Sequence, residues 1–268
     1  MSYPFIFIVI MMTLMIWVPW LWRYHIRPLW EKRVLSRYLK QHPSWINIKK
    51  TEHLLKGLYK NVRATRVSRN ECKQMGLTNQ HEFIYGEIQF LSFFSILDKI
   101  RPRAHEKFYD LGCGGGKATI SAALFFDVAQ SVGIELLPGL CTLANQQLIK
   151  AQHEIHSNKA IDAPLYLQKL SRVQFINGNF LHHDFSDGDI IFINATALPG
   201  NIWDELCVKL LQLKPGSRVI VTTKTVSHHA FELIYQGREL MSWGMNSVRI
   251  YTHRVTTHAH CHCLKAQL

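Results

Sequence analysis

The sequence predicts an α/β fold: a Rossmann-like sheet of seven strands that ends in a late β-hairpin and follows an N-terminal transmembrane helix. Three observations support this prediction. Residues 108–135 read as a strand, a glycine-rich turn, a helix and a second strand. Strand and helix patterns then alternate to about residue 255, and residues 4–22 contain no charged side chain.

An apolar run opens the chain. Residues 4–22 are just long enough to cross a bilayer as a helix, and Trp17, Trp20 and Trp22 lie at the C-terminal end, where interfacial aromatic residues belong. Basic residues follow, so the positive-inside rule predicts a single-pass membrane protein whose remaining residues are cytoplasmic. A cleaved signal peptide fits less well because no Lys or Arg precedes the run. An interfacial helix or a buried hairpin is the remaining alternative.

A basic segment comes next. From Arg23 to Asn70, 13 Lys and Arg residues stand against two Glu residues, so this segment accounts for nearly all of the net charge of +12. We expect helices here, broken at Pro28 and at His42-Pro43. Beside a membrane anchor, these charges favour contact with anionic lipid, and binding to nucleic acid is the alternative.

The α/β pattern follows the basic segment. An amphipathic helix is expected at 89–100, and strands at 107–111, 131–135, 173–176, 189–193 and 218–222. Helices are expected after Gly116, from Pro138 and around 203–213, and a hairpin at 239–255 turns near Gly244. We therefore divide the chain into an anchor (1–22), a basic juxtamembrane segment (23–80), an α/β domain (81–256) and a His/Cys-rich tail (257–268).

The glycine-rich turn indicates the class of cofactor. Gly112 and Gly114 follow the first strand, but Lys117 occupies the place of the third glycine of a dinucleotide-binding turn. Asp110 would repel a pyrophosphate, whereas it suits the cationic amino-acid part of S-adenosylmethionine. Glu135 ends the second strand, where it can accept hydrogen bonds from ribose hydroxyls. The pattern favours S-adenosylmethionine over NAD and over a purely structural turn.

Further motifs narrow the class of protein. They are Phe-Ile-Tyr-Gly-Glu-Ile (83–88), Asn-Gly-Asn-Phe-Leu (177–181), Ile-Phe-Ile-Asn-Ala (191–195), Leu-Lys-Pro-Gly-Ser-Arg-Val-Ile (213–220) and the Ser-Trp pair at 242–243. With the glycine turn, they make residues 83–253 resemble the non-SET histone-lysine methyltransferases of the disruptor-of-telomeric-silencing type and their bacterial relatives. The resemblance implies a class I methyltransferase fold.

The same resemblance implies a cofactor site assembled from separate stretches of the chain. Tyr85, Gly86 and Glu87 would close over the methionine end of S-adenosylmethionine. Asp110 would hold the amino group, Gly112 and Gly114 would allow close backbone approach, and Glu135 would bind ribose. At the adenine end, Phe180 would stack on the ring and Asn179 would accept from the exocyclic amine.

The acceptor end of the implied site involves two further residues. Asn194 would lie where the methyl group is transferred, and Trp243 would line a channel for the incoming lysine. Each side chain has a structural alternative: Asn194 is a common turn residue, and Trp243 could pack within the hairpin. Likewise Tyr85 could cap the following helix and Phe180 could belong to the core.

Two positions depart from the family pattern. Asn179 stands where the family usually has an acid, and Ile88 replaces a hydroxyl residue, which removes one polar contact near the cofactor. The long basic N-terminal part is also unlike the nuclear members. The histone substrate is therefore the least transferable part of the resemblance.

The cysteines and histidines predict no metal site. Cys113 and Cys207 are expected to be reduced, packed thiols, because the six cysteines lack the spacing of a secreted disulfide framework. The tail contains three histidines and two cysteines at 258–263. On a strand, the histidines would point to one face and Cys261 and Cys263 to the other, so other residues would have to complete a site.

Together these patterns predict an S-adenosylmethionine-dependent methyltransferase, tethered to a membrane, that methylates a lysine of a protein substrate. A small-molecule or lipid methyltransferase at the bilayer and an inactive cofactor-binding scaffold are the alternatives. We assign no general base, since alignment and desolvation can supply much of the catalysis of an in-line methyl transfer.

Overall fold

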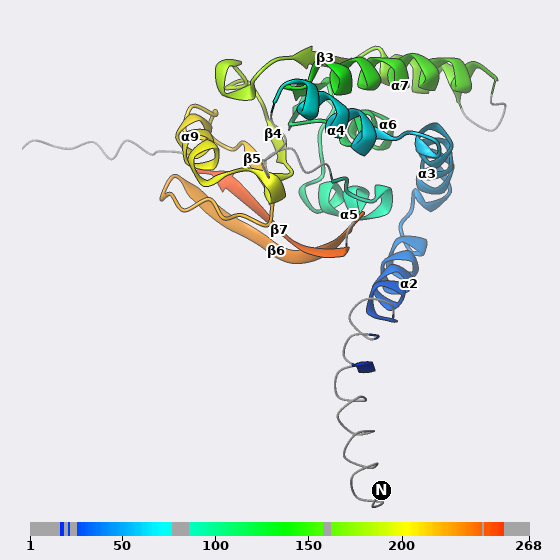
Figure 1. Ribbon diagram of the computed structural model, residues 1–268. Coiled ribbons are helices and arrows are strands. Elements are labelled where there is room, and N and C mark those ends of the chain that lie inside the picture. The colour runs from blue at the N-terminus through cyan, green and yellow to red at the C-terminus, as the bar shows by residue number, and fades with distance from the viewer. Residues whose placement is uncertain are drawn as a thin grey trace, which may run out of the picture.

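Seven strands form one mixed sheet in the part of the chain that the structure, a computed structural model, describes (Figure 1). Described are residues 17–18, 21, 26–76, 86–157, 162–242 and 244–254, without the side chains of residues 27, 28, 31 and 32. The strands lie in the order β3-β2-β1-β4-β5-β7-β6. Their bounds are β1 Lys107–Leu111, β2 Gln130–Glu135, β3 Val173–Asn177, β4 Ile190–Ile193, β5 Arg218–Thr222, β6 Phe231–Met241 and β7 Gly244–His253.

The pairing of the strands confirms the predicted class I arrangement. Strands β1 to β5 pair in parallel, and β7 pairs antiparallel with both β5 and β6. The prediction for the start of the hairpin was wrong, because β6 begins at Phe231 and not near Glu239. Strand β6 lies at the edge of the sheet, where most of its first half is exposed, so it lacks the apolar alternation that marks a half-buried strand.

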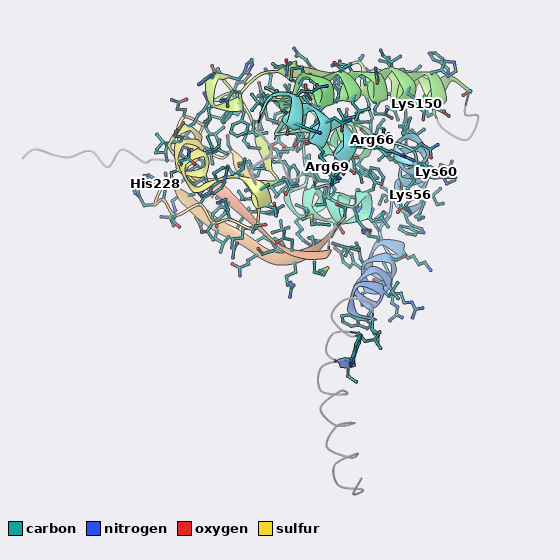
Figure 2. All side chains as sticks on the ribbon, viewed as in Figure 1. Lys56, Lys60, Arg66, Arg69, Lys150 and His228 are labelled. Carbon is teal, nitrogen blue, oxygen red and sulfur yellow. The ribbon has the colours of Figure 1, made fainter. Side chains whose placement is uncertain are left out.

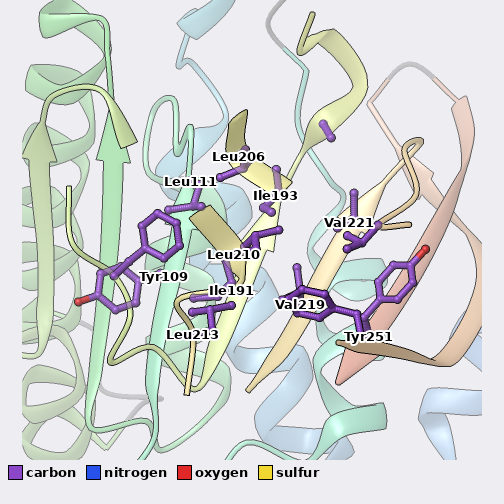
Figure 3. Packing of buried hydrophobic residues seen from close by; sticks show 14 of the residues in the cluster. Tyr109, Leu111, Ile191, Ile193, Leu206, Leu210, Leu213, Val219, Val221 and Tyr251 are labelled. Carbon is purple, nitrogen blue, oxygen red and sulfur yellow. The ribbon is translucent and has the colours of Figure 1, made fainter. Parts of the chain in front are cut away.

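Helices cover both faces of the sheet. Figure 3 shows the face that packs against α9 (Gly200–Leu210), where Leu206 and Leu210 meet Ile191, Val219 and other strand residues. The opposite face packs against α5 (Phe90–Ile100) and α6 (Lys117–Phe125). A third cluster joins α6 to α7 (Pro138–Ser157) and α8 (Ala163–Leu170). Helix α8 was not predicted, although Asp162 caps its N-terminus by accepting from the amide of Leu165.

Within the described residues, four helices precede β1: α5 and, before it, α2 (Arg27–Lys40), α3 (Trp45–Tyr59) and α4 (Ala64–Gln74). The predicted break at His42-Pro43 separates α2 from α3, whereas Pro28 lies in the first turn of α2, where proline is tolerated. Leu54, Leu55 and Leu58 of α3 are buried in the cluster that contains α6 and α7. The basic segment therefore supplies part of the core of the α/β domain.

The predicted membrane anchor lies largely outside the described residues. Of residues 4–22, the structure describes Trp17, Val18 and Leu21, and their side chains are exposed. Within the described ranges, no helix has both the length and the apolar character that a bilayer crossing requires.

Candidate functional site

A cavity of about 470 Å³ opens at the carboxyl ends of the parallel strands, where the order of the strands reverses between β1 and β4. Open α/β sheets bind ligands at this switch point, and the volume is typical of a small-molecule site. The predicted site residues that the structure describes all line the cavity: Gly86, Glu87, Asp110, Gly112, Gly114, Glu135, Asn179, Phe180 and Asn194. The structure thus brings together residues that are far apart in the sequence.

The glycine turn follows β1 in a conformation that favours glycine. Gly112, Gly114 and Gly116 have φ values of 81°, 55° and 78°. A Cβ at Gly116 would lie 2.5 Å from the ring of Phe175, whereas a Cβ at Gly112 would meet no atom within 4 Å. The turn is therefore packed against the protein at Gly116 and open toward the cavity at Gly112.

Glu135 holds the turn from the end of β2. Its side chain is buried, and its two oxygens accept hydrogen bonds from the amides of Gly114 (2.7 Å) and Leu137 (2.9 Å). Burial raises the pKa of this carboxyl group, while the amide hydrogen bonds oppose that rise. Each carboxylate oxygen has two acceptor sites, so the lone pairs that the amides leave can still receive hydroxyl donors from a ligand.

Asp110 lies at the floor of the cavity, near the end of β1. Its side chain is buried and accepts a hydrogen bond from Thr119 Oγ1 at 2.8 Å. Burial raises the pKa of Asp110 to about 7, and Glu135 adds to the rise by electrostatic repulsion. No Lys or Arg is paired with Asp110 among the described contacts, so a cationic ligand group would find an uncompensated carboxylate there.

The adenine end of the predicted site is formed after β3. Asn179 and Phe180 are both half-buried, and Phe180 packs against the core cluster beneath α9. The side-chain oxygen of Asn179 accepts from the amide of Leu181 at 2.9 Å and so caps a short 3₁₀ turn, Phe180–His182. This cap fixes the side chain at the edge of the cavity, where one lone pair of the oxygen remains for a ligand donor.

Residues 86–88 line the cavity, and residues 86–89 are fastened to the end of β6. Ile88 forms an antiparallel bridge with Met241, and the amide of Ser242 donates to the carbonyl of Glu87 at 2.8 Å. Glu87 also forms an ion pair with Lys117, whose Nζ lies 3.0 Å from Glu87 Oε2. This short segment, here called the cover segment, joins the cavity to the late hairpin.

Asn194 fastens the cover segment to the end of β4. Its Nδ2 donates to the carbonyl of Gly86 at 2.9 Å, and its Oδ1 accepts from Thr222 at 2.8 Å and from Thr196 at 3.1 Å. The side-chain amide is therefore oriented from both sides. Sequence reasoning assigned Asn194 to the methyl-transfer end but could not predict these contacts, because Thr222 and Thr196 belong to no motif.

Helices α3 and α4 support the site from outside the sheet. Tyr59 donates from its hydroxyl to the carbonyl of Gly115 in the glycine turn at 3.0 Å. Glu71 accepts from the amide of Gly139 at 2.8 Å in the first turn of α7, and Ser68 lines the cavity. The distribution of charge along the basic segment could not predict these contacts. They are made by Tyr59, Ser68 and Glu71, which are not among its lysines and arginines.

Several predicted features fall outside the described residues: Tyr85, Trp243 and the histidines and cysteines of the tail. Their assigned roles remain predictions. Among the described cysteines, Cys113 and Cys141 are buried free thiols and Cys207 is a half-buried one, as expected for reduced, packed side chains. The described ranges contain no cluster of His, Cys, Asp and Glu that could hold a metal ion.

The cavity fits S-adenosylmethionine. Asp110 can bind its ammonium group, and Glu135 can bind its ribose hydroxyls. The open space over Gly112 lets the cofactor come close to the protein backbone. Fold and site together define a class I S-adenosylmethionine-dependent methyltransferase. Residues 67–254 match the family model of the histone methylation protein DOT1. The chain belongs to this family.

Curated relatives share the central part of the chain. It is 28% identical over 206 residues to a "Histone-lysine N-methyltransferase, H3 lysine-79 specific" of Candida albicans, a match that covers 75% of this chain and 14% of that protein. It is 30% identical over 126 residues to a "Protein-lysine N-methyltransferase" of Saccharolobus islandicus, covering 47% and 62%. The chain thus spans less than two thirds of the length of these relatives.

Among solved structures, an RNA methyltransferase from Salinibacter ruber in complex with S-adenosyl-L-homocysteine is similar. The two share 20% identity and a TM-score of 0.47, over 60% of this chain and 90% of that one.

The raised pKa of Asp110 makes cofactor binding depend on pH. Below about pH 7 the ligand-free protein carries a protonated Asp110, which cannot pair with an ammonium group. We expect the affinity for S-adenosylhomocysteine to fall about tenfold per pH unit as pH decreases from 7, and to level off above 7. Isothermal titration calorimetry between about pH 5.5 and 7.5 measures this. An Asp110→Asn variant should bind weakly without that slope, and a flat wild-type profile would contradict the assignment.

Proposed function

We propose that the protein transfers a methyl group from S-adenosylmethionine to a lysine side chain of a protein substrate. The observation that carries this proposal is the cavity between Asp110 and Asn194, in a chain whose DOT1-family match spans residues 67–254. The names of the relatives support a protein-lysine acceptor, since both protein-lysine and histone-lysine enzymes are among them.

The acceptor end of the cavity suits a neutral amine. The lining residues that follow Asn194 in the chain are Thr196 and the apolar Ala197, Leu198, Pro199 and Ile202. A lysine ammonium has an unperturbed pKa of about 10.4, and an apolar surrounding disfavours the charged form. S-adenosylmethionine supplies an electrophilic methyl group when it is bound. The chain then contributes alignment and exclusion of water, with the Asn194 side chain holding the cover segment in place.

Methyl transfer can be tested with the full-length protein and radiolabelled S-adenosylmethionine. A membrane-plus-cytosol extract serves as the source of acceptors, and an Asp110→Ala variant as the matched control. We expect label in one or more protein bands, on lysine after acid hydrolysis, with wild type only. Label in the organic extract would assign a lipid or small-molecule acceptor instead. Binding of S-adenosylhomocysteine without label in any fraction would favour a scaffold.

We also propose that residues 4–22 anchor the protein in a membrane, with the α/β domain on the cytoplasmic side. The uncharged sequence of that run supports the anchor. The outward face of α2, the next described helix, supports it too: Trp30, Val34 and Tyr38 are exposed on one side, next to exposed Arg33 and Arg37. Aromatic and basic side chains in this combination are typical of helices at a membrane surface.

Anionic lipid is the partner that we propose for the basic segment. Lys56 on α3, Lys60 directly after that helix, and Arg66 and Arg69 on α4 are exposed (Figure 2). Each basic side chain near an anionic surface contributes about 1 kcal/mol. Alkaline carbonate extraction of cell membranes tests the anchor, and protease protection tests the orientation. Release of the full chain into the carbonate supernatant would contradict the anchor, and retention on nucleic acid but not on anionic vesicles would contradict the lipid assignment.

A further inference from the structure

Thr223 has an unusual backbone conformation directly after β5. Its φ of 67° lies in the left-handed region, where a β-branched residue is a genuine outlier. The amide of Lys224 donates to the carbonyl of Thr222 at 2.7 Å, across Thr223. A hydrogen bond of this span around a residue with positive φ is typical of a γ-turn that is rare and strained. Such strain persists only where neighbouring groups enforce it, and it is concentrated at functional sites.

The β6–β7 hairpin enforces this strained turn. Arg249, on β7, donates from Nη1 to the carbonyls of Thr223 (3.2 Å) and Lys224 (3.1 Å). Its Nε donates to Oε1 of Gln236 on β6 at 3.2 Å, which keeps the guanidinium group in place. The amide of Thr223 donates to the carbonyl of Ser247, also on β7, at 2.9 Å. The hairpin therefore binds the backbone on both sides of the strained residue.

The turn places the Thr223 hydroxyl against a residue that lines the cavity. Thr223 Oγ1 lies 2.8 Å from Oγ1 of Thr196, which belongs to the lining. Thr196 donates to Oδ1 of Asn194 at 3.1 Å and accepts from Nδ2 of Asn246 at 3.2 Å. A hydroxyl group has one proton, so Thr223 is the donor in its contact with Thr196. A chain of contacts thus runs from Arg249 through Thr223 and Thr196 to Asn194.

We propose that Arg249 and Thr223 are positioning residues for methyl transfer. Arg249 maintains the strained turn, the turn holds the Thr223 hydroxyl against Thr196, and Thr196 then fixes the side-chain amide of Asn194. This rests on the proposed function, since it concerns the acceptor end of the same cavity. If the turn relaxed, Asn194 Oδ1 would keep only Thr222 of its two described donors. Alignment matters here, because a displacement of about 1 Å can slow a reaction about 100-fold.

The test separates the rate of methyl transfer from the binding of cofactor. The full-length protein, radiolabelled S-adenosylmethionine and the membrane-plus-cytosol extract give the rate, and calorimetry gives the Kd of S-adenosylhomocysteine. Thr223→Gly removes the hydroxyl and lets the turn relax, so transfer should slow at least about tenfold while the Kd changes less than about threefold.

Conservative variants should recover the rate. Thr223→Ser keeps the hydroxyl, and we expect it to transfer within about threefold of wild type. Arg249→Met removes the donors and should behave like Thr223→Gly. Arg249→Lys should recover part of the rate, because an ammonium group can donate to a turn carbonyl but lacks the planar fork that also binds Gln236.

A second strained residue provides the matched control. Arg101 follows α5 with φ of 47° and is exposed. Arg101→Gly and Thr223→Gly both relieve an unfavourable φ, so each should raise the Tm by up to about 2–4 °C, but only Thr223→Gly should slow transfer.

Three results would overturn the assignment: a wild-type rate in Thr223→Gly or Arg249→Met, a loss of S-adenosylhomocysteine affinity as large as the loss of rate, or an equal loss of rate in Arg101→Gly. Absence of label with wild type would instead contradict the proposed function.

Discussion

A Glu135→Ala variant is expected to lose at least about 100-fold in affinity for S-adenosylhomocysteine. The substitution removes the acceptors proposed for the ribose hydroxyls, and it also frees the amide of Gly114, which Glu135 binds at 2.7 Å. The glycine turn then loses its attachment to the end of β2. Calorimetry measures the affinity, and a variant that binds like wild type would contradict the cofactor site itself.

The control for this prediction is Glu135→Gln. An alanine leaves the buried amides of Gly114 and Leu137 without an acceptor, which costs about 1–3 kcal/mol for each donor, so a stability loss could be mistaken for a binding loss. Glutamine keeps one oxygen and the side-chain volume. We therefore expect Glu135→Gln to stay closer to wild type in thermal stability and still to bind more weakly, which separates the ligand contact from the structural one.

A Gly116→Ala variant is expected to be destabilised by about 2–5 kcal/mol, which is a large fraction of the stability of a domain. The backbone has φ of 78°, and the new methyl group would lie 2.5 Å from Phe175 and 2.9 Å from Ala144. Phe175 lies on β3 and Ala144 is buried on α7, so the new methyl group would press between these two elements. Urea unfolding followed by circular dichroism measures the effect.

Gly112→Ala is the matched variant for this substitution. Its φ of 81° is equally unfavourable, but a methyl group there would meet no atom within 4 Å. We expect a loss of only about 1–2 kcal/mol in stability, together with strongly weakened binding, since the methyl group would occupy space that the ligand needs. Equal stability losses in the two variants would show that conformational strain, and not packing against Phe175, decides the cost at Gly116.

The parallel strands could be predicted from the sequence of this chain alone. Each of β1, β2, β4 and β5 is a short run of apolar residues between turn residues, and the predicted bounds differ from the observed ones by a residue at most. Asp110 and Glu135 could be predicted as site residues because each lies at the C-terminal end of its strand. The carboxyl ends of parallel strands lie at the same edge of a sheet, so the two side chains had to meet there.

What could not be predicted depends on contacts between distant residues. Thr222 and Thr196 orient Asn194, and Tyr59 binds the glycine turn, but nothing local distinguishes these side chains from other polar residues. Helix α4 looked like one more part of the basic segment. In the structure its Ala64 and Cys72 are buried against Leu137 and Leu140, beside the cavity. The pattern of charged residues indicates which side of such a helix is exposed. It does not predict which residues pack against the opposite side.

For the proposed protein-lysine methyltransferase, the attachment of the cover segment has a consequence for the number of methyl groups added per encounter with an acceptor. Residues 86–89 are hydrogen-bonded both to Asn194 and to the end of β6, so the cover segment and the late hairpin are joined. If S-adenosylhomocysteine leaves when the cover segment moves away, the hairpin moves with that segment and the acceptor channel opens at the same time. A protein acceptor would then dissociate between successive rounds, and a fully methylated lysine would arise from several separate visits. Intermediate methylation states would accumulate in the order mono, di and tri.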